Sequence, residues 1–211
     1  MKSAAMPALC ALGFLASTIS SAVTYDLPKE LPERKAGLWE MITRGTFGPN
    51  KIEIVKRYCL DAATDPVLQE TEIQGRELSV IYNDVQCKPP VVTRSGNAVS
   101  GAMTCEAFKA SVRPTGKDFR WKINYLSPSE VIVDEYAIAH NIQGGGEDIS
   151  VQRQTWVGAC PEGQKPGDGV EFFPAYNGGK SEKPHTENLF ESRKVLTKML
   201  NEANELNSRF H

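Results

Sequence analysis

The sequence predicts a mainly β protein, built on a single antiparallel meander sheet of about seven or eight strands. Apolar and polar residues alternate in several runs, as a strand with one buried face requires, most clearly at Phe119, Trp121, Ile123 and Tyr125. Most links between these runs are short, and parallel neighbours would need long crossovers. We expect the sheet to curve into a half-barrel or a small barrel. Two helices accompany it, a short one near 65–72 and a C-terminal helix.

The expected strands are separated by clusters of Gly, Pro and Asn, which favour turns. They cover residues 37–47, 51–59, 77–87, 98–113, 119–125, 131–142 and 149–157. Asp65 followed by Pro66 is typical of a helix N-terminus, with Asp65 as the N-cap.

Composition divides the chain into five segments. They are a signal peptide (1–22), an extended lead-in (23–35), a disulfide-stapled β domain (36–173), a linker (174–185) and a C-terminal amphipathic helix (186–210).

The first segment has the pattern of a secretory signal. Lys2 precedes an apolar run at residues 8–16, and small residues end at Ala22, where we expect cleavage. An uncleaved anchor is the alternative, but the run is shorter than the roughly 20 residues that span a bilayer. We therefore predict export to the periplasm, and no transmembrane segment in the mature chain.

Four cysteines remain when Cys10 leaves with the signal peptide, and an even number in an exported chain predicts two disulfides. Three pairings are open, and the sequence alone does not choose among them. We favour Cys87 with Cys105, which bracket a turn-like site, and Cys59 with Cys160, which would tie the start of the domain to its end.

Charge and motifs predict neither nucleic-acid binding nor catalysis. The formal net charge is -2, and no basic patch alternates with aromatic residues. The three histidines, His140, His185 and His211, do not have the spacing of metal ligands. No G-x-S-x-G motif is present. We accordingly predict no catalytic residue, no metal and no cofactor.

Aromatic residues in the strands are candidates either for the core or for the wall of a ligand cavity. Trp39 and Trp156 each lie in a β run close to a glycine. If the sheet is curved, an apolar ligand would rest against it. The candidate lining residues are Trp39, Phe119, Trp121, Ile123, Tyr125 and Trp156.

The predicted C-terminal helix carries an apolar stripe in two columns, with Leu189, Leu196, Ala203 and Phe210 seven residues apart and Met199 and Leu206 beside them. The stripe would pack on the open face of the sheet, bind a partner or a second copy, or belong to a disordered tail. Three heptads are marginal for an independent coiled coil.

Four short motifs lie along the chain at residues 36–41 (AGLWEM), 59–63 (CLDAA), 156–161 (WVGACP) and 164–168 (QKPGD), with Cys87 and Cys105 between them. Together they resemble an exported bacterial family called domain of unknown function 3617. The resemblance covers about residues 34–168. It implies a signal-bearing, cysteine-paired envelope protein without an assigned reaction, and it supplies no catalytic residues. The tail from Ala175 to His211 departs from the family.

The leading hypothesis is a non-enzymatic periplasmic binding or scaffold protein that holds a small apolar ligand on a curved sheet. The alternative is an envelope interaction module that grips a protein partner through the C-terminal helix. The third hypothesis, an enzyme, would require His140 to lie beside an acid and a hydroxyl group in one cleft.

Overall fold

The computed structural model describes residues 25–47, 49–81, 85–107, 116–140, 146–177, 179 and 184–210, so the predicted signal peptide lies outside the described residues. The strands are β1 (Gly37–Phe47), β2 (Asn50–Leu60), β3 (Val85–Cys87), β4 (Val91–Ser95), β5 (Ala98–Ala107), β6 (Lys117–Ser127), β7 (Glu130–Ala139), β8 (Glu147–Gly158), β9 (Asp168–Tyr176) and β10 (His185–Asn188). The helices are α1 (Thr64–Ile81) and α2 (Leu189–Phe210).

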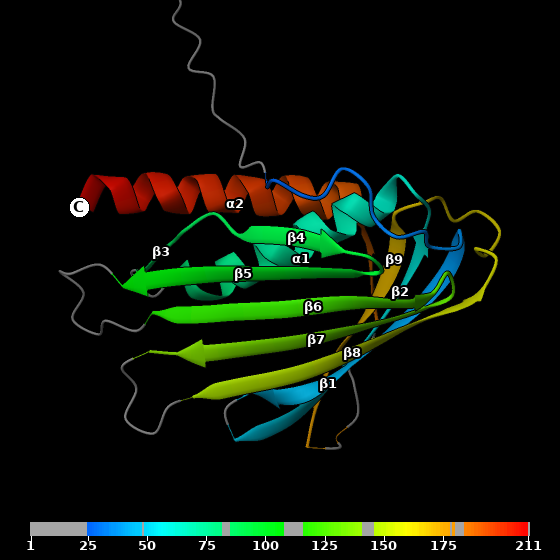
Figure 1. The fold of residues 1–211 in the computed structure, drawn as a ribbon, viewed down its shortest axis with the longest axis horizontal. Helices are drawn as coiled ribbons and strands as arrows, with labels where there is room; N and C mark the ends of the chain where they lie inside the picture. Colours follow the sequence, from blue (N-terminus) through cyan, green and yellow to red (C-terminus); the bar gives the residue numbers. More distant parts are fainter. Residues whose placement is uncertain are drawn as a thin grey trace, which may run out of the picture.

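The strands of the described residues form one ten-stranded antiparallel sheet in the order β10-β9-β2-β1-β8-β7-β6-β5-β3, with β4 also paired to β5. The two ends of this order do not pair, so the sheet is open, and Figure 1 shows it curved. The predicted curved antiparallel sheet is confirmed. Strands β5 to β8 form a meander, but β1 also pairs with β8, and β2 pairs with β9.

The elements differ from the prediction at three places, and the described sheet has ten strands instead of seven or eight. Strand β4 lies at Val91–Ser95, where no strand was expected. The mid-chain helix runs on to Ile81, so the strand expected at residues 77–87 shrinks to β3. Strands β9 and β10 occupy both ends of the predicted linker, and the C-terminal helix begins at Leu189. Pro174 lies in β9 beside a register shift against β2, where a missing backbone donor is tolerated.

Helix α1 packs on the sheet, and α2 packs on α1 on the same side of the sheet (Figure 1). Val67, Leu68 and Ile73 of α1 share one core with side chains of the strands. A smaller cluster joins Leu78 of α1 to Leu200 of α2. None of the helices in the described residues is long and apolar enough to cross a membrane.

Asp61 and Asn188 cap the N-termini of the two helices, and the predicted N-cap Asp65 does not. The Asp61 carboxylate accepts hydrogen bonds from the backbone N–H groups of Ala63 (3.0 Å) and Thr64 (2.9 Å), and so caps α1. The prediction of Asp65 as N-cap is therefore wrong. Asn188 caps α2 by accepting from the N–H of Phe190 at 3.0 Å.

Asp65 instead forms a buried ion pair with Arg34 of the lead-in, with 2.9 Å between Oδ1 and Nε. Arg34 also donates to Gln154 of β8 at 2.8 Å and lies over the Trp39 ring. Burial raises the pKa of Asp65 in spite of the opposing effect of Arg34. The pair connects the lead-in, α1 and the sheet at one point.

The cysteines join Cys59 to Cys160 and Cys87 to Cys105, which is the pairing favoured from the sequence. Cys87 and Cys105 lie directly opposite each other on β3 and β5. Cys160 follows β8, so its bond to Cys59 of β2 spans the intervening strand β1.

We predict that removing these disulfides destabilises the protein unequally. Cys59→Ala with Cys160→Ala should cost about 4 to 5 kcal/mol, because the bond closes a loop of 101 residues. The matched control, Cys87→Ala with Cys105→Ala, should cost about 3 kcal/mol, because its separation is 18 residues. Urea unfolding followed by tryptophan fluorescence measures both, and equal losses would contradict the loop-length argument.

Candidate functional site

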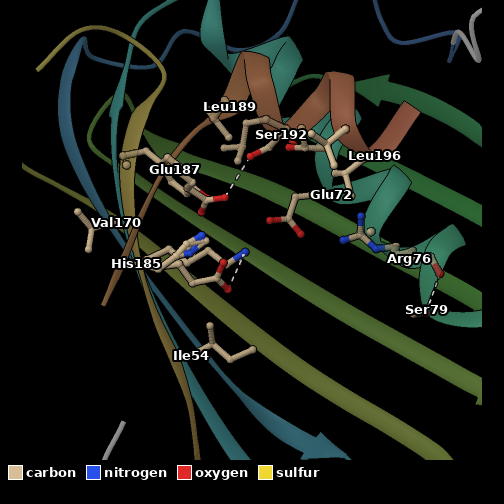
Figure 2. A pocket seen from close by; sticks show the side chains of 18 of the residues that line it. Ile54, Glu72, Arg76, Ser79, Val170, His185, Glu187, Leu189, Ser192 and Leu196 are labelled. Atoms are coloured by element: carbon tan, nitrogen blue, oxygen red, sulfur yellow. Dashed lines mark hydrogen bonds and ion pairs between the residues drawn. The ribbon is translucent and has the colours of Figure 1, made fainter. Parts of the chain in front are cut away.

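A cavity of about 1190 Å³ lies between the sheet and the two helices (Figure 2). Its walls come from β1, β2, β6, β7, β8, β9, β10, α1 and α2. The apolar lining residues are Ile52, Ile54, Leu68, Phe119, Ala137, Val170, Leu189, Val195 and Leu196. Charged side chains lie among them, so the site combines a hydrophobic wall with several polar anchoring points.

A second cavity of about 240 Å³ shares part of this wall. Ile52, Ile54, Lys56, Leu68 and Glu72 line both cavities. The smaller cavity reaches the aromatic side chains of β6. Together the two form a continuous lining along the inner face of the sheet.

Helix α1 turns one face toward the larger cavity. Leu68, Glu72, Gly75, Arg76 and Ser79 line it, at the three- and four-residue spacing of a helix face. Figure 2 shows Glu72 and Arg76 pointing from α1 into the space above Ile54. A side chain added at Gly75 would meet no heavy atom within 4 Å at its Cβ, so glycine leaves room here.

Ion pairs connect the charged lining residues across the cavity walls. Lys56 of β2 is 3.3 Å from Glu171 of β9, and their side chains are 23% and 28% exposed, so solvent reaches them. On another wall, Arg76 is 2.7 Å from Glu135 of β7 and its guanidinium lies over the Trp121 ring.

The surroundings of Lys56 are acidic. Burial lowers the pKa of the Lys56 ammonium group, but the carboxylates of Glu72, Glu171 and Glu187 outweigh it and raise the pKa above its usual value. One ammonium group therefore lies within electrostatic reach of three carboxylates on α1, β9 and β10.

Glu187 links the sheet to α2. It accepts hydrogen bonds from the hydroxyl of Tyr58 on β2 and from the hydroxyl of Ser192 on α2, the latter at 3.2 Å (Figure 2). Burial raises the pKa of Tyr58, and the carboxylate of Glu187 raises it further. The acidic residues therefore raise the pKa of Tyr58 as well as that of Lys56, and both side chains belong to β2.

Four of the six predicted ligand-lining residues line one of the two cavities, and two do not. Phe119 lines the larger cavity, and Trp121, Ile123 and Tyr125 line the smaller one. Trp39, which is fully buried, and Trp156 line neither of these two cavities. Their indole N–H groups donate to the backbone carbonyls of residues 35 and 36.

The predicted stripe of the C-terminal helix also divides. Leu189 is buried in the main core, and Leu196 and Ala203 pack on the cluster of Leu78 and Leu200. Met199 and Leu206 are exposed, at 36% and 54%. The side chain of Phe210 lies outside the described side chains. Part of the stripe therefore holds α2 against its own chain.

His140 is 3.0 Å from Asp118, but it lines neither of the two cavities. Among the described residues, no group of three His, Cys, Asp or Glu side chains is arranged to hold a metal ion.

Sequence reasoning overlooked the charged residues of the cavity. The signal was present in β2, where Lys56 takes the inward position between Ile54 and Tyr58 in the alternation of the strand. Glu135 takes the same kind of position between Val133 and Ala137 of β7. A charged residue at an inward-facing position of a strand is a signal of a functional site.

No protein-family model and no curated protein matches the chain. A solved structure, an S-type phycobiliprotein lyase from Guillardia theta, is similar with a TM-score of 0.28 and 10% identity, covering 60% of this chain and 90% of that chain. A TM-score this low does not indicate a shared function. The resemblance of residues 34–168 to domain of unknown function 3617 stays a prediction.

We predict that stability falls in alkaline solution through Tyr125. Its hydroxyl accepts a hydrogen bond from Gln69 at 3.1 Å, and burial raises its pKa to about 12, with the Asp65 carboxylate adding to the shift. Because the pKa is raised on folding, the stabilisation is complete below about pH 10 and is lost as the pH rises toward 12.

The unfolding free energy of the wild type and of Tyr125→Phe, measured in urea from pH 8 to 11.5, checks this. The variant should lose less stability than the wild type between pH 10 and 11.5, since it has no phenol to ionise at this site. Parallel curves for the two proteins would contradict the assignment.

Proposed function

We propose that this chain is an exported, periplasmic, non-enzymatic binding protein that holds a small, largely apolar ligand in the cavity between its sheet and its helices. The single observation that carries the proposal is the cavity itself. At about 1190 Å³ it is somewhat larger than typical small-molecule sites, which span roughly 300–1,000 Å³, so it has room for a ligand of that class.

The lining supports an apolar ligand with a polar end. Aliphatic and aromatic side chains from the sheet, such as Ile54 and Phe119, face Leu68 of α1 and Leu196 of α2 across the same cavity. Burying apolar ligand surface against them is favourable by about 25 cal/mol per Å². The few charged groups between them would fix the orientation of the ligand.

The periplasmic location rests on separate support. The signal-like pattern of residues 1–22 and the pairing of Cys59 with Cys160 and Cys87 with Cys105 are typical of exported proteins.

Binding of Nile red, a neutral apolar dye, tests the proposal. Gly75→Trp should place an indole ring in the cavity and weaken dye binding about tenfold or more, without destabilising the fold, because glycine is the poorer helix former and its Cβ position is open. The matched control is Val151→Trp, where the exposed Val151 side chain belongs to neither cavity.

Native mass spectrometry of protein purified gently from a bacterial periplasm gives a second readout. A bound mass that disappears on denaturation and is absent from Gly75→Trp would support the proposal. A wild-type protein that carries no added mass and does not bind Nile red would overturn it.

A further inference from the structure

The charged residues of the larger cavity are unequal in number. Among the described residues that line it, seven are acidic and three are basic. The basic residues are Lys56, Arg76 and Lys117, and each already has an acidic partner in Glu171, Glu135 and Asp148. The pairs cancel, so the cavity keeps an excess of negative charge.

Glu72 is the clearest part of this excess. Its carboxylate points from α1 into the cavity, as Figure 2 shows. Its charge acts on Lys56, but the Lys56 ammonium group already pairs with Glu171 at 3.3 Å, so Glu72, Glu171 and Glu187 share one positive charge. A carboxylate in a partly buried site gains most from a cation that also donates hydrogen bonds.

Glu187 adds a second carboxylate in the same region. Its two oxygens accept from Tyr58 and Ser192, and each carboxylate oxygen can accept one further hydrogen bond. The raised pKa values of Lys56 and Tyr58 have Glu72 and Glu187 among their common causes, which indicates that both carboxylates act on one stretch of the β2 wall.

We propose, on the basis of the proposed function, that the ligand is a cationic amphiphile: an apolar chain or ring system that carries a primary ammonium group. The ammonium group donates hydrogen bonds to Glu72 and Glu187, and the apolar part lies against Ile54, Phe119 and Leu196. Charge complementarity favours this class over a fatty acid or another anion, whose carboxylate would face the unpaired acids while every basic lining residue is occupied.

Three probes of equal chain length test the class: dodecylammonium, dodecanoate and dodecanol, each competing with Nile red below micellar concentrations. Dodecylammonium should displace the dye at about tenfold lower concentration than dodecanoate, with dodecanol between them. Glu72→Gln should lower the dodecylammonium affinity about tenfold relative to the dodecanol affinity, because only the ammonium group interacts with the lost charge. Glu106→Gln, an exposed acid paired with Lys88 outside the cavity, should change neither.

Lys56→Met provides a change in the opposite direction. This substitution removes the positive charge that Glu72, Glu171 and Glu187 share. Dodecylammonium should therefore bind severalfold more tightly, and dodecanoate should bind more weakly. This keeps the test informative if Glu72→Gln perturbs α1.

The outcomes separate the two proposals. If Nile red binds and Gly75→Trp abolishes it, but the three dodecyl probes bind equally and Glu72→Gln changes nothing, the cationic class is wrong and the binding function stands. If Nile red and all three probes fail to bind, the proposed function falls and the cationic class with it.

Discussion

An open curved sheet has to cover one apolar face, and this constraint shapes the rest of the molecule. A closed barrel would bury that face against itself, but here the two end strands, β10 and β3, do not pair with each other. Helix α1 supplies the cover and α2 holds α1 through Leu78, Leu200 and the hydrogen bond from Gln74 to Thr197. The helices do not pack tightly against the whole face, and the space left between them and the sheet is the cavity.

The cavity is also where the local rules of the sheet are broken. Lys56 and Glu135 take inward positions that the alternation would give to apolar residues, and Glu72 does the same on the inner face of α1. Desolvating a charge is costly unless it is paired or reached by solvent. Lys56 and Glu135 are paired, whereas Glu72 shares the single Lys56 ammonium group with Glu171 and Glu187. Such conflicts between pattern and packing are typical of functional sites.

The antiparallel architecture was predictable because the alternation in β6 and the short links are local signals. The pairing of β1 with β8 was not, because it depends on contacts more than a hundred residues apart in sequence. The length of α1 was missed because Leu78 and Val80 alternate like residues of a strand, whereas in the helix Val80 packs in the main core and Leu78 packs against Leu200 of α2. Phe119, Trp121 and Tyr125 could be named from the alternation in β6, but Tyr58 was not named. The acidic lining residues could be recognised only once α1, β9 and β10 were brought together.

The seam between β1 and β8 also sets the order in which the molecule can assemble. Strands β5 to β8 can form from neighbouring hairpins, and so can β1 with β2, but the two parts can join only when β8 is available to pair with β1. Closing so long a loop is entropically slow, which places this protein among the slower folders. The bond between Cys59 and Cys160 crosses the same seam, so its oxidation would report the moment at which the two halves of the sheet meet.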